Sequence, residues 1–338
     1  AIYGSRGANG VVIITTKRGE EGRGRVDLDV SFGLQELSKK IELMNGPQFA
    51  AFTRDGRNNA WALRGGDPDD PNEVRPGAFQ FFDEFRNPET VETVTDWQDE
   101  VFQTAPVSNY QLSFSGGSKN IRYMISGGYF DQEGIIPGSD FRRFTGRANV
   151  DGTISERFSV GLSFTAYRSE GNYARTDGHL GRRGLITAML ANPPTAPILD
   201  EDGEYYTELG TIGVPVENPF RIIEEFTDYR KQNGLLINTY LDWEITDGLK
   251  FRTTLGANND QSVVRLWKSS EIGMWGGRNS PATAASQTSA TFDWLNENTL
   301  TYTRSFNRHN LSALAGFTAQ HSSIDFVSVA ATEFGNDY

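Results

Sequence analysis

The chain has 338 residues, of which 37% are hydrophobic, and its formal net charge is −12. It contains no cysteine, which excludes thiolate catalysis, cysteine-bound zinc and a disulfide framework. The acidic balance disfavours nucleic acid as a partner, because phosphate binding requires clustered Lys and Arg side chains.

The first nineteen residues predict a tight turn that leads into a buried strand. Gly4, Gly7 and Gly10 permit positive φ and close backbone approach, and the β-branched run 11–14 fits a strand buried on both faces. A phosphate-binding glycine loop is the alternative, but such a loop opens a helix, whereas this one precedes a strand. The sequence starts without an initiator Met or a signal peptide, so we expect it to be a fragment.

Nine further segments alternate apolar and polar residues with a period of two, which predicts strands with one apolar and one polar face. They are residues 26–34, 110–115, 121–126, 143–150, 158–165, 235–245, 249–255, 292–302 and 311–319. No apolar stretch approaches the roughly 20 residues of a membrane-spanning helix. A strand of a membrane barrel needs only about 9–11 residues and turns every second one to the lumen, so this absence leaves a barrel open.

The connections between these segments differ in length in a regular way. Short links fall near 116–120, 151–157, 246–248 and 304–309, long ones near 36–107, 170–231 and 259–288, and one of intermediate length at 131–140. If the strands run up and down in chain order, all short turns lie at one end and all long loops at the other. That asymmetry is typical of outer-membrane barrels, whereas the Greek-key connections of a sandwich would mix the two.

The polar faces carry charged residues in mid-strand, among them Arg143, Arg147 and Arg252. These suit a wet lumen and equally a solvated sheet face. Aromatic residues are expected at strand ends, where they would form the interfacial girdles of a barrel, although strands are aromatic-rich in general. The residues concerned are Tyr110, Tyr129, Phe158, Trp243, Trp294 and Tyr302.

Residues 2–17 resemble the end of the plug domain of the SusC/RagA family of TonB-dependent outer-membrane transporters. The residues that carry this plug-terminal motif are Tyr3, Gly4, Arg6, Gly7, Asn9 and Gly10. Residues 95–117, with the run Asp-Trp-Gln-Asp-Glu-Val-Phe, and residues 123–134 are similar to barrel segments of the same family. Residues 39–52 resemble the short helix that follows its first barrel strand, with Asn45 as a candidate cap and Pro47 in the first turn.

The resemblance implies an all-β fold: an antiparallel transmembrane β-barrel, present as roughly nine of the family's twenty-two strands, preceded by the last strand of a plug. The expected division is 1–19 for the end of the plug and 20–338 for the N-terminal part of the barrel with its long extracellular loops. A passive porin-like barrel, an enzymatic outer-membrane barrel and a soluble β-sandwich binding module remain as alternatives.

The same resemblance implies TonB-dependent active import of an oligosaccharide or peptide across the outer membrane, and no enzymatic activity or cofactor. The expected partners are a SusD-like surface lipoprotein that covers the long loops, and the TonB-ExbB-ExbD complex, which would act on a segment upstream of residue 1. The barrel is expected to contact outer-membrane lipid.

No catalytic or metal-binding constellation is evident in the sequence. The three histidines are far apart and lack the spacing of a zinc helix. The acidic segments 67–70 and 200–203 have a composition that calcium prefers, but solvated turns are favoured because neither completes a calcium loop. Four loop aromatics are candidate contacts to a ligand or to the lipoprotein, although they could instead pack their own loops. They are Tyr205, Tyr206, Trp267 and Trp275.

Overall fold

A computed structural model describes residues 17–176, 184–206, 216–272 and 281–334. The described residues form one nine-stranded antiparallel sheet in which the strands follow one another in chain order, from β1 at one edge to β9 at the other. The strands are β1 (Gly22–Gln35), β2 (Ala105–Gly117), β3 (Ile121–Glu133), β4 (Asp140–Ser155), β5 (Phe158–Asn172), β6 (Phe226–Thr246), β7 (Leu249–Lys268), β8 (Thr283–Phe306) and β9 (His309–Thr332).

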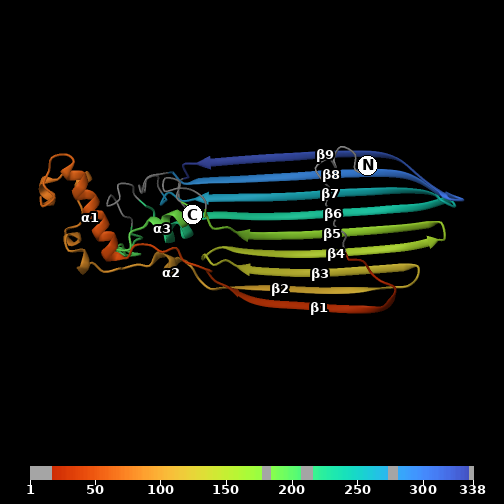
Figure 1. Cartoon of the computed structure of the whole chain (residues 1–338), viewed down its shortest axis with the longest axis horizontal. Coiled ribbons are helices and arrows are strands. Elements are labelled where there is room, and N and C mark those ends of the chain that lie inside the picture. Colours follow the sequence, from red (N-terminus) through yellow and green to blue (C-terminus); the bar gives the residue numbers. More distant parts are fainter. Residues whose placement is uncertain (1–16, 177–183, 207–215, 273–280, 335–338) are drawn as a thin grey trace.

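The predicted asymmetry of the connections is confirmed (Figure 1). Tight turns join β2 to β3, β4 to β5, β6 to β7 and β8 to β9 at one end of the sheet, and every helix lies at the other end. The helices are α1 (Gly46–Ala62), α2 (Trp97–Val101), α3 (Leu185–Ala191) and α4 (Pro219–Glu225), with the short 3₁₀ turns η2 (Asn72–Val74), η3 (Gly77–Phe79), η4 (Asp83–Arg86) and η5 (Pro88–Thr90). We call the end of the sheet that carries the helices the loop end, and the end with the tight turns the turn end.

The alternation gives the sheet an apolar face and a polar face. Along β5, Phe158, Leu162 and Phe164 share the apolar face, and Ser163 lies on the polar face. The apolar face is open to its surroundings: Leu162 is 44% exposed. Packed cores occur instead among the loops, in one cluster around α1 and in a second that joins α2, α3 and α4.

The helix expected within residues 39–52 begins directly after its predicted cap and extends further along the chain than expected. It starts at Gly46, behind an Asn45 cap whose side chain accepts from the Gln48 N–H at 3.0 Å, while the Gln48 side chain accepts from the Asn45 N–H at 3.1 Å. This reciprocal capping box fixes the start, and Pro47 fits the first turn because its missing N–H has no intrahelical partner there. The predicted cap and the place of Pro47 in the first turn are confirmed, and the helix continues to Ala62, beyond residue 52 at which the resemblance ends.

The loop expected over 259–288 is also too long. Strand β7 continues to Lys268 and β8 begins at Thr283, so Trp267 lies in a strand, paired with Thr227 and Ala284, and not in a loop. The cause is the length of β6, whose 21 residues provide backbone partners for β7 as far as Lys268. Residues 258–262 are polar on both faces, so the period that predicts a strand is lost while the hydrogen-bonded ladder continues.

The expected aromatic girdle is present only in part. Phe158 and Trp243 stack at the turn end, with ring centroids 5.7 Å apart and an interplanar angle of 9°. Trp294 lies in the middle of β8, and Tyr110 in the middle of β2, because both strands extend further toward the loop end than the alternation indicates. For these two residues the expected position at a strand end is wrong.

Candidate functional site

On the polar face, Tyr167 of β5 reaches across a whole strand to a carboxylate. Its hydroxyl passes over Gly234 of β6 and donates to Asp260 of β7. The register places these three residues directly opposite one another, and a Cβ on Gly234 would lie 2.2 Å from Cε1 of the tyrosine ring. Gln232 donates to both oxygens of the same carboxylate at 3.0 Å. The side chains therefore tie three strands together on one face.

Tyr240 makes the mirror-image arrangement nearer the turn end. From β6 it passes over Gly161 of β5, and its hydroxyl donates to Oδ1 of Asp151 on β4 at 2.9 Å. A Cβ on Gly161 would lie 2.0 Å from Cε1 of the tyrosine ring. Asp151 is buried, and it also forms an ion pair with Arg18, which precedes β1.

The segment before β1 thus lies against the polar face of the sheet. The Arg18 guanidinium stands 5.8 Å from the centre of the Tyr240 ring, and the Lys17 carbonyl accepts from the Asn149 side chain at 2.9 Å. Gly19 is pressed so closely on β3 that a Cβ would lie 2.3 Å from the Tyr123 carbonyl oxygen. The polar face is therefore the side of the sheet on which residues 17–19 are held.

The three arginines predicted as lumen charges all lie on this polar face, but in different environments. Arg252 is paired with Asp242 at 3.2 Å, and its guanidinium lies 4.3 Å from the centre of the Tyr240 ring. Arg143 and Arg147 lie on β4, four residues apart and exposed. Within the described ranges neither has an ion pair or a hydrogen bond, and the Arg143 guanidinium lies 5.6 Å from the centre of the Phe130 ring.

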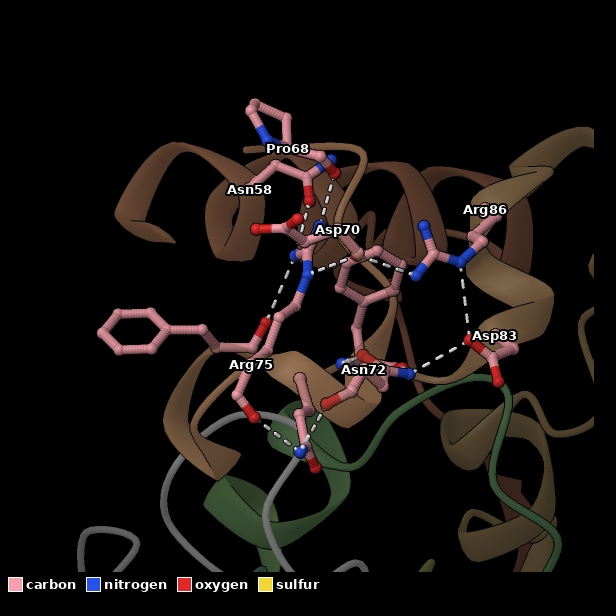
Figure 2. Close-up of polar contacts among 10 residues, drawn as sticks. Asn58, Pro68, Asp70, Asn72, Arg75, Asp83 and Arg86 are labelled. Atoms are coloured by element: carbon pink, nitrogen blue, oxygen red, sulfur yellow. Dashed lines mark hydrogen bonds and ion pairs between the residues drawn. The ribbon is translucent and has the colours of Figure 1, made fainter. Parts of the chain in front are cut away.

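At the loop end, residues 46–91 form a small unit with an apolar cluster of its own. Figure 2 shows the polar contacts of the buried arginine in this unit. Arg75 is only 2% exposed. Its guanidinium donates to the Asp70 carbonyl at 2.8 Å, to the Asn58 side-chain oxygen at 2.8 Å and to the Pro68 carbonyl. The Phe81 ring lies 5.1 Å from it. One buried cation thus gathers the end of this unit by satisfying several carbonyl groups.

The second long loop packs against the first. The Trp97 indole donates to the Pro193 carbonyl at 2.9 Å, and the Thr95 hydroxyl donates to the Ala196 carbonyl at 2.7 Å. Asn218, fully buried, donates to the carbonyls of Ile198 and Tyr206 at 2.9 and 3.0 Å. The two loops therefore form one platform over the sheet end.

Tyr205 is committed to this platform. Its ring stacks on Phe220, with centroids 6.3 Å apart, and its hydroxyl donates to Glu224 at 2.5 Å. Burial and this carboxylate together raise the pKa of Tyr205 to about 12. Tyr206 packs against the apolar cluster of the same loop.

The acidic turns hold their own backbone. Asp70 accepts from the Trp61 indole at 2.8 Å and from the Asp67 N–H at 3.0 Å, and Asp200 accepts from the Asp202 N–H at 3.0 Å. Across the part of the chain that the structure describes, three or more His, Cys, Asp or Glu residues do not gather into a group that could hold a metal ion. In the same part, the helices are too short or too polar to cross a membrane.

We compared the chain with known proteins to find its relatives. No family model matches the chain. The chain is 35% identical over 323 residues to TonB-dependent receptor P3 of Formosa agariphila, and the aligned region covers 95% of the chain and 29% of that receptor. It is 32% identical over 210 residues to TonB-dependent receptor SusC of Bacteroides thetaiotaomicron, which covers 61% of the chain and 18% of SusC. The chain belongs to the SusC/RagA-type TonB-dependent receptors.

Solved structures agree with this assignment at the level of the fold. The RagAB peptide transporter matches 99% of the chain with a TM-score of 0.76 at 23% identity, over 39% of its own length. The RagAB peptide importer in its open-open state matches with the same TM-score. This receptor chain is thus a partial barrel, and it spans about 30% of the length of the curated receptors P3 and P26.

The predicted sites of the receptor chain are distributed unevenly over the structure. The plug-terminal motif, from Tyr3 to Gly10, and Trp275 lie outside the described residues. Trp267 lies on the apolar face, in the same alternation as Phe251, and contacts Phe334 with ring centroids 5.1 Å apart. Sequence reasoning missed both tyrosine bridges and the Arg75 cluster, since each depends on residues that only the strand register or the loop fold brings together.

Proposed function

We propose that the chain is the N-terminal part of the barrel of a TonB-dependent importer in the outer membrane, with residues 1–19 ending a plug and 20–338 forming barrel wall and loops. The observation that carries this proposal is the run of nine strands in chain order, with every long loop at one end, in a chain related to TonB-dependent receptors. In this arrangement the apolar face contacts lipid and the polar face lines the lumen.

The docking of residues 17–19 supports the choice of lumen face. A plug lies inside a barrel, so the residues that leave it must reach the wall from within. Lys17 and Arg18 contact Asn149 and Asp151 on the polar face. Arg143, Arg147 and Arg252 are then lumen charges.

We further propose that the platform at the loop end receives a SusD-like lipoprotein and that the cargo is an oligosaccharide or a peptide. The relatives SusC and RagAB support this partner, and RagAB is itself a peptide importer. The contacts of Tyr205 and Tyr206 favour a role in holding the platform, and Trp267 stands where an interfacial aromatic would. Of the four aromatic residues proposed from the sequence, Trp275 is the one we assign to ligand or lipoprotein contact.

The test is uptake by cells that carry the full-length receptor, with fluorescently labelled oligosaccharide and peptide mixtures as probes. Import should stop when a protonophore collapses the proton gradient, and the lipoprotein should co-purify with the receptor in detergent. Uptake that persists without the gradient would favour a passive porin-like barrel. Chemical conversion of a probe by the purified receptor would favour an enzyme.

A further inference from the structure

Between Arg143 and Arg147, the polar face carries a hollow of about 90 Å³. Its lining comes from three adjacent strands, β2, β3 and β4, and includes the side chains of Asn109, Gln111, Ser126, Phe130 and Thr145. Amides and hydroxyls surround it, and the two guanidinium groups flank it. Such groups donate hydrogen bonds, and a guanidinium forms its strongest bonds with planar anions such as carboxylate.

The residue at the floor of the hollow is a glycine, although a side chain would fit there without a clash. Gly128 lies opposite Gln111 on β2 and Thr145 on β4, in the middle of the hollow. A Cβ there would meet nothing closer than the Tyr110 carbonyl oxygen, at 3.6 Å, which is an ordinary contact. By contrast, Gly161 and Gly234 are each covered by a tyrosine ring. At Gly128 the missing side chain therefore leaves space that the structure does not fill.

The two arginines lack the ion pairs that Arg18 and Arg252 form on the same face. Arg18 is paired with Asp151, and Arg252 with Asp242. Across the strands toward β1, Arg147 is paired with Ser126, which is paired with Ser113, which is paired with Asp27. The first carboxylate in that direction is therefore three strands away, or about 14 Å at the usual strand spacing. Among the residues that the structure describes, neither of these two positive charges forms an ion pair with a carboxylate, in a chain whose net charge is −12.

The Phe130 ring holds the Arg143 guanidinium in a defined position. It lies directly opposite Arg143 in the β3–β4 ladder, on the same face, and its ring centre is 5.6 Å from the guanidinium carbon. A cation held against a ring keeps its N–H edge available to an anion, because the ring contact uses the flat face of the guanidinium.

We infer that Arg143, Arg147 and the hollow over Gly128 form a subsite on the inner wall for carboxylate groups of the ligand in transit. This inference rests on the proposed function, since it requires the polar face to line the path of the cargo. The shared chemistry is a carboxylate, which a uronic-acid oligosaccharide or an acidic peptide would supply. The subsite would select acidic cargo over neutral cargo of the same shape.

Binding to the full-length receptor in detergent, measured by calorimetry, tests the inference with two matched pairs of probes. One pair is a galacturonate oligosaccharide and its methyl ester, and the other is an Asp-containing peptide and its Asn counterpart. We expect the acidic member of one pair to bind roughly tenfold more tightly than its neutral partner, as one charge-assisted hydrogen bond would give, and the preference to weaken with salt. The pair that shows the preference identifies the source of the carboxylate.

The variant Arg143→Gln with Arg147→Gln should remove the preference and leave binding of the neutral probe unchanged. Gly128→Val, which keeps both charges and fills the hollow, should weaken the acidic probe by about the same factor, and it guards against misfolding of the double variant. Arg122→Gln is the matched control, because it removes a charge from the same face outside the hollow. It should keep the preference.

A wild-type receptor with no preference in either pair overturns the inference, as does a preference that survives both the double variant and Gly128→Val. The proposed function fails separately. If uptake depends on the proton gradient while charge selectivity is absent, only the subsite is wrong.

Discussion

Tyr167 and Asp260 lie on strands separated by a third, and the hydroxyl of the first reaches the carboxylate of the second only because the residue between them is Gly234. Tyr240, Gly161 and Asp151 repeat this relationship in the opposite direction along the sheet. In both cases a ring covers a glycine, which supplies the side-chain packing that a glycine in a strand lacks. The pair of bridges fixes the register of β4 to β7 on the polar face.

The first prediction concerns these covered glycines. Gly234→Ala or Gly161→Ala should destabilise the full-length receptor by about 1–3 kcal/mol, because the added methyl group displaces the ring and breaks its bond to the carboxylate. Gly146→Ala is the control, since a Cβ there meets nothing within 4 Å. Unfolding titrations in lipid vesicles measure all three. Equal midpoints would show that the rings do not depend on the glycines.

The second prediction concerns the two faces of β5. Leu162→Arg should cost about 2–4 kcal/mol if the apolar face meets the middle of the bilayer, whereas Ser163→Arg on the lumen face should be mild. The two positions are adjacent in β5, so their distance from the turn is matched. The same titrations in vesicles give both values. Penalties of similar size would mean that the faces are wrongly assigned.

Strand positions could be predicted from the sequence where one face is apolar and the other polar, as along Phe158 to Thr165. Prediction failed where both faces are polar, as at Asn258 to Ser262, because only the backbone ladder defines the strand there. Arg143 could be placed on the polar face from alternation. Its lack of a carboxylate partner could not be foreseen, since that depends on which residues the register brings beside it.

The tyrosine bridges show the same limit at longer range. Tyr167 and Asp260 are 93 residues apart in sequence, and a slip of one residue in any ladder between them would put them on opposite faces. The Arg75 cluster depends on the path of an irregular loop, for which the sequence provides turn residues but no period. The Asn45 cap, in contrast, is a local interaction, and it could be predicted.

The third prediction concerns that cluster. Arg75→Ala should destabilise the unit of residues 46–91 by about 2–4 kcal/mol, because several buried carbonyl groups lose their donor together. Arg64→Ala, at an exposed position two residues after the end of α1, is the control and should be neutral. Hydrogen exchange of the α1 amides in the intact receptor reports on this unit alone. Unchanged exchange in Arg75→Ala would show that the guanidinium is dispensable.

The fourth prediction concerns pH. The Trp61 indole and the Asp67 N–H hold the pKa of Asp70 below its usual range. A carboxyl group with a lowered pKa in the folded state stabilises that state fully above its unfolded pKa of about 3.9, and the contribution is lost as pH falls through the lowered folded pKa. The stability difference between the wild-type receptor and Asp70→Asn should therefore shrink as pH falls below 4. The measurement is the free energy of unfolding of both proteins from pH 7 to pH 3, and a constant difference between the two curves would contradict this prediction.

The last prediction concerns the segment that enters β1. The ion pair of Arg18 with the buried Asp151 holds residues 17–19 on the wall, so Arg18→Gln should free them and expose the Lys17 peptide bond to trypsin. In a double-mutant cycle with Asp151→Asn, we expect a coupling energy of about 1 kcal/mol, above that of a fully exposed pair. Arg25 and Asp27 form the matched control pair, since their side chains are 74% and 42% exposed and their coupling should be close to zero. Cleavage after Lys17 should accelerate in Arg18→Gln and remain slow in Arg25→Gln. If both variants are cleaved at the wild-type rate, other contacts hold the segment. The first of these to test are the hydrogen bond from Asn149 to the Lys17 carbonyl and the close approach of Gly19 to Tyr123.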